Sequence, residues 1–201
     1  MNRLIFLFDL DSVVTKQEIL VAVSKDIGIY GQMKNLTEKT ISGELPFKQS
    51  FLKRIDLLKQ IPVSKIQNIV ANIELNERVV DFIKKNVSRC YIVTDNLDVW
   101  IKKLIEKLKM ENNVFSSKAL VDDSDTLQDV FSVVDKSSVI KQMILPFVAI
   151  GAGNNDAEMI ESAQVGIGFG ATKAIAPAVL ECATHVVYDE KALTRLLEKL
   201  V

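Results

Sequence analysis

The chain has 201 residues, of which 48% are hydrophobic and 25% charged, enough for one globular domain or for one domain with a smaller insertion. Its 25 Lys and Arg against 26 Asp and Glu give a net charge of -1, which argues against nucleic acid or an anionic membrane as a partner. Two cysteines, Cys90 and Cys182, do not suggest a disulfide framework, and the apolar run at 4–8 is too short for a signal peptide or a membrane span. These features predict a cytoplasmic protein.

Short apolar segments alternate with longer segments of helical period along most of the chain. Strands are predicted at residues 4–8, 90–94, 147–151, 165–169 and 185–188. Helices are predicted at residues 77–87, 97–110, 136–143, 156–163, 175–182 and 191–200. This alternation is typical of an α/β protein with a Rossmann-like three-layer architecture, in which helices cover both faces of a parallel sheet.

About eighty residues separate the first two predicted strands, far more than one crossover connection needs. Segments 18–27, 47–59 and 64–73 carry apolar residues at helical spacing. We therefore expect a small helical cap at residues 15–75, inserted after the first strand, and an α/β core domain at residues 1–14 and 76–201. Ligands of open parallel sheets bind at the carboxyl ends of the strands, so the cap would act as a lid.

Residues 113–134 contain apolar strings on either side of an acidic turn, Asp122-Asp123-Ser124-Asp125, which predicts a β-hairpin. The turn acids are either solvated or form a weak cation site.

Asp9 and Asp11 directly follow the first predicted strand. Residues i and i+2 of an extended chain share a face, so both carboxylates point the same way at the end of a buried strand. A hard cation such as Mg2+ between a carboxylate and a phosphate would relieve their repulsion and leave one carboxylate free to attack phosphorus. The alternative is a pair of solvated acids in a strand-to-loop turn.

Further polar groups follow predicted strands in chain order. Thr94 ends the second strand, Lys136 opens a helix, and Asn155 and Asp156 follow the strand at 147–151. Taken singly, Thr94 and Asp156 also fit helix caps, and Lys136 fits an exposed lysine. Together with the acid pair before them, these groups resemble the four ordered motifs of the haloacid dehalogenase-like hydrolases.

The cap segment narrows this resemblance. Glu18 and the string GELPFKQSFLKR at 43–54 are similar to the opening motif and the cap segment of phosphoserine phosphatases with a small helical cap. The resemblance implies an Mg2+-dependent phosphomonoester hydrolase that acts through an aspartyl-phosphate intermediate, with a small phosphorylated metabolite as its substrate.

The resemblance also implies catalytic and metal-binding roles. Asp9 would be the nucleophile and an Mg2+ ligand, and Asp11 would be the acid/base whose main-chain carbonyl also binds the metal. Lys136 would neutralise the charge shared by the nucleophile and the phosphate, and Thr94 would donate to phosphoryl oxygens. Asp156 would complete the metal site.

Four more residues would bind the rest of the substrate. Glu18 and Arg54 would bind an amino and a carboxylate group, Phe47 would close over the substrate, and Asn155 would contact it as well. The alternative is a helix-surface ion pair beside an ordinary core phenylalanine.

Two positions depart from the family's motifs. The fourth motif, usually Gly-Asp-Gly-x-Asn-Asp, reads GAGNND at 151–156, and Ala152 offers no side-chain oxygen to a metal. The second motif reads Thr94-Asp95-Asn96 in place of Ser-Gly-Gly. Either Asp95 or Asp156 supplies the missing oxygen, or the protein is a catalytically impaired relative that binds a phosphorylated ligand or a protein partner. Asp95 could instead cap the helix that starts at residue 97.

Overall fold

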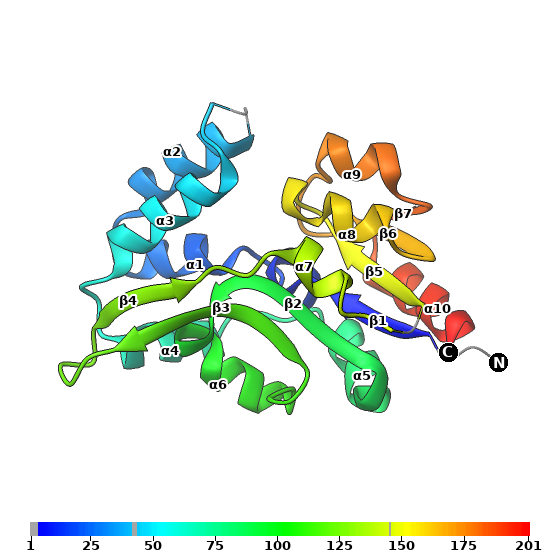
Figure 1. The fold of residues 1–201 in the computed structure, drawn as a ribbon, viewed down its shortest axis with the longest axis horizontal. Helices are drawn as coiled ribbons and strands as arrows, with labels where there is room; N and C mark the ends of the chain where they lie inside the picture. The colour runs from blue at the N-terminus through cyan, green and yellow to red at the C-terminus, as the bar shows by residue number, and fades with distance from the viewer. Residues whose placement is uncertain (1–3, 42–43, 145) are drawn as a thin grey trace.

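A computed structural model describes residues 4–41, 44–144 and 146–201, and a twisted sheet forms its centre (Figure 1). Within these ranges the strand order is β4-β3-β2-β1-β5-β6-β7. All neighbouring strands are parallel except β3 and β4. The strands are β1 (Ile5–Phe8), β2 (Cys90–Leu97), β3 (Val114–Val121), β4 (Leu127–Ser132), β5 (Phe147–Gly151), β6 (Val165–Phe169) and β7 (His185–Val187).

Strand β1 lies in the middle of the sheet because its four residues are all apolar and need cover on both sides. Its two neighbours come from distant parts of the chain: Phe6 pairs with Cys90 in β2, and Ile5 pairs with Phe147 in β5. The carboxyl ends of these three parallel strands therefore meet at one edge of the sheet.

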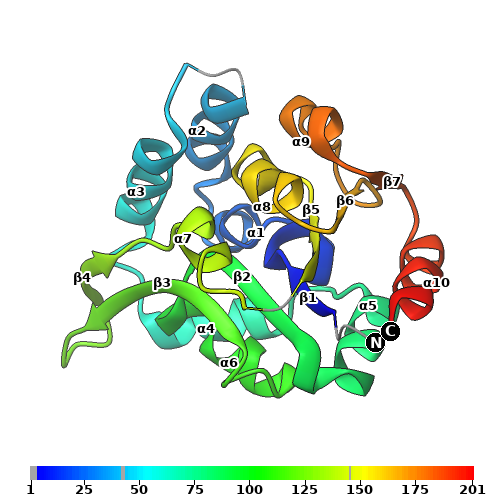
Figure 2. The ribbon, with the colours of Figure 1, turned by 45° about the vertical axis from the view of Figure 1, so that its right-hand side comes forward.

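Helices cover both faces, which confirms the predicted α/β architecture (Figure 2). One face packs against α5 (Glu77–Lys85), α6 (Asp98–Leu108) and α10 (Glu190–Leu200). The other packs against three shorter helices: α7 (Lys136–Ile140), α8 (Ala157–Glu161) and α9 (Pro177–Cys182). The edge ring contact between Phe6 of β1 and Phe82 of α5, with centroids 5.2 Å apart, belongs to the first of these layers.

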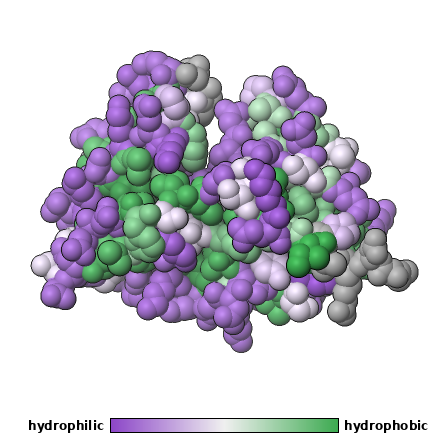
Figure 3. Space-filling model, viewed as in Figure 1, coloured by the Kyte–Doolittle hydropathy of each residue, from purple (hydrophilic) through white to green (hydrophobic). Residues whose placement is uncertain are grey.

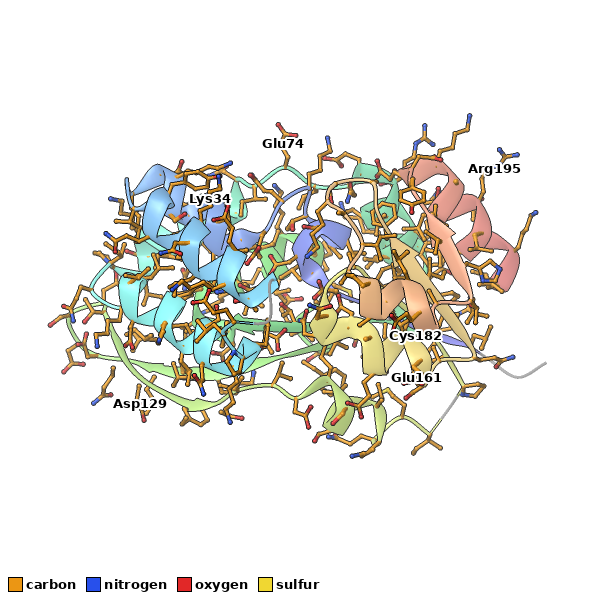
Figure 4. The ribbon with its side chains drawn as sticks, turned by 90° about the horizontal axis from the view of Figure 1, so that it is seen from above. Lys34, Glu74, Asp129, Glu161, Cys182 and Arg195 are labelled. Carbon is orange, nitrogen blue, oxygen red and sulfur yellow. The ribbon has the colours of Figure 1, made fainter. Side chains whose placement is uncertain are left out.

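The predicted hairpin is present and also extends the main sheet, because β3 pairs with β2. Strand β4 forms the outer edge, and the side chain of Asp129 points away from the molecule there (Figure 4). The acidic turn is tied to the chain: the Asp125 main-chain oxygen accepts from the Val63 N–H at 2.7 Å. The Asp125 carboxylate accepts from the Ser64 hydroxyl at 2.5 Å, so the turn docks on the start of α4 (Val63–Ala71) and is not simply solvated.

The long connection after β1 forms α1 (Ile19–Asp26), α2 (Tyr30–Ile41), α3 (Phe47–Leu58) and α4. Helices α2 and α3 rise above the sheet, whereas α4 packs against α6 (Figure 1). The sequence pattern did not indicate α2, because Met33 is the only buried side chain among those described in it. The ends of the connection meet at an isolated bridge between Thr15 and Leu75. The division into a cap at 15–75 and a core stays a prediction.

Neither cysteine is in a disulfide, and Cys90 is buried whereas Cys182 lies on α9 (Figure 4). Among the helices of the described ranges, none combines the length and the apolar character needed to cross a membrane.

Candidate active site

The chain leaves β1 through an irregular turn at Leu10–Val14 that places the first acid pair. The Asp9 N–H donates to the Ile150 main-chain oxygen at 2.9 Å, which fixes the position of Asp9 relative to β5. Within the turn, Ser12 has φ 64°, and its N–H donates to the Thr15 hydroxyl at 3.2 Å. Asp9 and Asp11 consequently line the same cavity.

Asp9, Lys136 and Asp156, which are far apart in sequence, form one buried cluster. The Lys136 ammonium donates to Asp9 Oδ1 at 2.8 Å and to Asp156 Oδ1 at 2.6 Å. The other Asp156 oxygen accepts from the N–H groups of Ala152 and Gly153 at 2.9 and 2.8 Å. Lys136 is therefore the cation that holds two buried carboxylates side by side, and Asp156 has both oxygens engaged.

These contacts set the protonation of the cluster. Burial and the nearby Asp156 charge raise the pKa of Asp9 to about 8, although Lys136 opposes the rise. Burial alone would lower the pKa of Lys136, but Asp156 and Asp9 outweigh it and raise that pKa. For Asp156, burial is outweighed by Lys136 and by hydrogen bonds, so its pKa is lowered. The cluster therefore favours the charged forms of Lys136 and Asp156, whereas burial favours the protonated form of Asp9.

Asp11 is held by two donors at the cavity wall. Its carboxylate accepts from the Ile19 N–H at 2.7 Å and from the Asn96 side-chain amide at 2.9 Å. Burial and the Glu18 charge raise the pKa of Asp11 to about 6 in spite of these bonds. Thr94 is fully buried behind Asn96, and its hydroxyl accepts from the Asn96 N–H and amide, so Thr94 does not line the cavity.

Asp95 takes part in the site and does not cap α6. Helix α6 begins after Leu97 without a side-chain cap, so the capping interpretation of Asp95 is wrong. The Asp95 carboxylate instead accepts from the Asn155 amide at 2.5 Å and lies 4.0 Å from the Lys136 ammonium. Burial raises the pKa of Asp95, while Lys136 lowers it.

A cavity of about 320 Å³ opens above these acids, between the strand ends and the first helices of the long connection. In the space-filling view the molecule is notched between the part that contains α2 and α3 and the part that contains α8 and α9 (Figure 3). Glu18 and Arg54 form an ion pair within the cavity wall. Phe47 also lines the cavity, where its ring stacks on Phe51 at 6.2 Å between centroids.

The donor set for a divalent metal is smaller than the resemblance implies. Ala152 is buried and contributes only main-chain atoms. In the described part of the chain, no cluster of three or more His, Cys, Asp or Glu side chains could hold a metal ion. Asp9 Oδ2 accepts no hydrogen bond from the described residues, so this carboxylate oxygen is available to a hard cation such as Mg2+, which also takes water and phosphate oxygens.

Asn96 and Lys173 are the site residues that the sequence analysis did not single out. Asn96 connects Asp11 to Thr94, and Lys173 lines the cavity from the loop after β6. The available signal was position, because Asn96 lies at the carboxyl end of β2 and Lys173 follows β6, and ligand-binding groups of parallel sheets collect at that edge.

In sequence, this chain is similar to phosphoserine phosphatases over most of its length. The phosphoserine phosphatase of Methanocaldococcus jannaschii is 28% identical over 211 residues, which cover 98% of this chain and 97% of that protein. The phosphoserine phosphatase of Archaeoglobus fulgidus is 27% identical and aligns over 87% of this chain, but this chain spans only 54% of its length. No family model matches the chain.

Solved structures give the same result for the fold. A structure described as a phospho-aspartyl intermediate analogue of phosphoserine phosphatase superposes with a TM-score of 0.82 at 25% identity, covering 99% of both chains. A substrate-bound phosphoserine phosphatase complex superposes with a TM-score of 0.81 at 24% identity, also over 99% of both chains.

Proposed function

We propose, from the premise that this chain is a phosphoserine phosphatase-like member of the haloacid dehalogenase-like hydrolases, that it hydrolyses a small phosphomonoester through an aspartyl-phosphate on Asp9. One observation carries the proposal: at the cavity floor, Lys136 holds one oxygen of Asp9 at 2.8 Å. The other oxygen is left without a hydrogen bond from the described residues. A carboxylate positioned in this way can attack phosphorus, while the adjacent ammonium balances the incoming charge.

Asp11 suits the acid/base step. It lines the same cavity as Asp9, and its pKa of about 6 lies near neutral pH, where a side chain can both give and take a proton. It would protonate the leaving alkoxide and then deprotonate the water that hydrolyses the aspartyl-phosphate.

The substrate proposal is phosphoserine or a close relative. The ion pair of Glu18 with Arg54 offers one group of each sign, which fits the amino and carboxylate groups of a zwitterion, and the Phe47 ring adds an apolar wall. Mg2+ would be held by Asp9 Oδ2 and the Asp11 main-chain carbonyl, and when bound it would neutralise phosphoryl charge.

The experiment is phosphate release from phosphoserine and from a panel of small phosphate esters, with Mg2+ in excess. Asp9→Asn should abolish release because it removes the nucleophile, whereas the exposed Asp129→Asn should not change it. No release from any ester by the wild-type protein would refute the proposed hydrolysis.

Ala152 supports a second candidate, a catalytically impaired relative that binds a phosphorylated ligand or a protein partner. The buried methyl group replaces a carboxylate at the edge of the proposed metal site. If this candidate is right, Ala152→Asp should create phosphatase activity or raise it greatly. A fall from a robust wild-type activity would contradict it.

A further inference from the structure

Lys173 is a cation in the cavity that the proposed reaction does not yet use. It is half-buried on the loop between β6 and α9, and it lines the same cavity as Asp9 and Asp11. Lys136 and Arg54 each have a carboxylate partner at this site. Lys173, in contrast, forms no hydrogen bond or ion pair with any residue in the described ranges. An ammonium group that faces a ligand cavity without a protein partner is available to a ligand.

The loop that carries Lys173 is fixed on both sides. The Thr172 hydroxyl donates to the Ser12 main-chain oxygen at 2.8 Å, which connects the loop to the turn that bears Asp11. The Ala176 N–H donates to the Ala152 main-chain oxygen at 2.8 Å, which connects it to the turn where the family has its metal-binding carboxylate. Lys173 is thereby placed between the acid pair and the position at which this chain has lost an anionic group.

The charges of the site leave room for a second cation. Four carboxylates gather at the strand ends: Asp9, Asp11, Asp95 and Asp156. A phosphate ester brings further negative charge. Lys136 is already engaged with three of the four carboxylates, namely Asp9, Asp156 and, at 4.0 Å, Asp95. Burial raises the pKa of Asp9 and of Asp11, and the positive charge of Lys173 is among the effects that oppose both rises, so it acts on the acid pair across the cavity.

We propose that Lys173 binds the phosphoryl oxygens of the substrate. Because Ala152 offers no carboxylate to Mg2+, the ammonium of Lys173 supplies part of the positive charge that a more tightly bound Mg2+ ion would supply. A lysine ammonium is a flexible point charge that binds phosphate without needing a ligand carboxylate of its own. The inference rests on the proposed function, because it names how that same site holds a phosphoryl group.

The test measures binding of inorganic phosphate by titration calorimetry in EDTA, so it requires no turnover. Lys173→Met should weaken phosphate binding by about 10- to 100-fold, the effect of losing one hydrogen bond between charged groups. Lys173→Arg should retain most of the affinity. The matched control is Lys65→Met, since Lys65 is exposed on α4 and does not line the cavity, and it should bind phosphate as the wild type does.

A second titration, with Mg2+ alone, separates phosphate binding from a merely structural role of the loop. The positive charge of Lys173 repels a second cation near Asp9 and Asp11. Lys173→Met should therefore bind Mg2+ more tightly than the wild type. Unchanged phosphate affinity in Lys173→Met, or a wild type that binds no phosphate in EDTA, would overturn the inference. A wild type that binds phosphate through Lys173 but releases none from any ester would refute the proposed hydrolysis and leave this inference standing.

Discussion

Lys136→Met removes the cation that the two buried carboxylates of the cluster share. The Lys136 side chain is 3% exposed, and its ammonium lies 2.8 Å from Asp9 and 2.6 Å from Asp156. Removing one partner of a buried ion pair costs about 3–5 kcal/mol, because the remaining charge loses its compensation. In a chain of this length the midpoint of thermal unfolding should fall by about 2–4 °C for each kcal/mol.

The loss of stability in Lys136→Met should be larger at higher pH. The pKa of Asp9 is raised from 3.8 to about 8 in the folded protein, so this group favours folding below about pH 4 and loses that contribution as the pH rises to about 8. Without Lys136 the pKa values of Asp9 and Asp156 should rise further. The variant should therefore lose less stability at about pH 5, where protons can partly replace the lost cation, than at about pH 8.

Urea unfolding in EDTA at both pH values measures this effect. The control is Lys59→Met, which breaks an exposed pair with Asp56 at 3.1 Å and should change stability by no more than about 0.5 kcal/mol. If the unfolding free energy of Lys136→Met stays within about 1 kcal/mol of wild type at about pH 8, Lys136 does not stabilise the fold by neutralising Asp9 and Asp156.

Three further outcomes are expected. Mg2+ must displace the proton of Asp9 to bind its carboxylate. The rise in unfolding temperature on adding Mg2+ should therefore be larger at about pH 8 than at about pH 6, and equal rises at the two pH values would contradict this. Asn96→Ala removes a donor at 2.9 Å from Asp11, which should raise the pKa of Asp11 and move the pH–rate profile to higher pH. A profile at unchanged pH would argue against the contact between Asn96 and Asp11. In Gly166→Ala the new Cβ would lie 2.3 Å from the Ile160 main-chain oxygen and should cost about 1–3 kcal/mol in urea unfolding. Gly31→Ala, where a Cβ meets nothing within 4 Å, should be neutral or stabilising, and equal effects of the two changes would refute the steric argument.

The parallel core was predictable because its strands are continuous apolar runs. The segment Ile5–Phe8 is buried along its whole length, and Val165–Phe169 is nearly so, and such segments have no alternative to the inside of a covered sheet. Helix α2 was not predictable, because it buries little apolar surface and is held by its contacts with α1 and α3. The joining of the hairpin to the main sheet also depends on a partner strand, β2, that no local pattern identifies.

The site was predictable to the extent that its groups follow strand ends. Asp9 and Asp11 could be expected to face one cavity, and the structure places them there. The bond from Lys136 to Asp156 could not be read from spacing, since it depends on how α7 and the turn after β5 pack together. Likewise, Asn96 stands between Thr94 and the cavity because β2 continues irregularly from Thr94 to Leu97.

The position of β1 between β2 and β5 has a consequence for how the protein forms. Phe6 pairs with Cys90 and Ile5 with Phe147, so neither partner of the strand that leads to Asp9 lies near it in the sequence. Contacts between such distant segments form slowly, because a long loop must close first. During synthesis one edge of this apolar strand stays open until residues 147–151 have left the ribosome. A chain truncated before β5 would thus expose a strand prone to aggregation, and the end of the sheet that carries Asp9 would be among the last parts of the molecule to form.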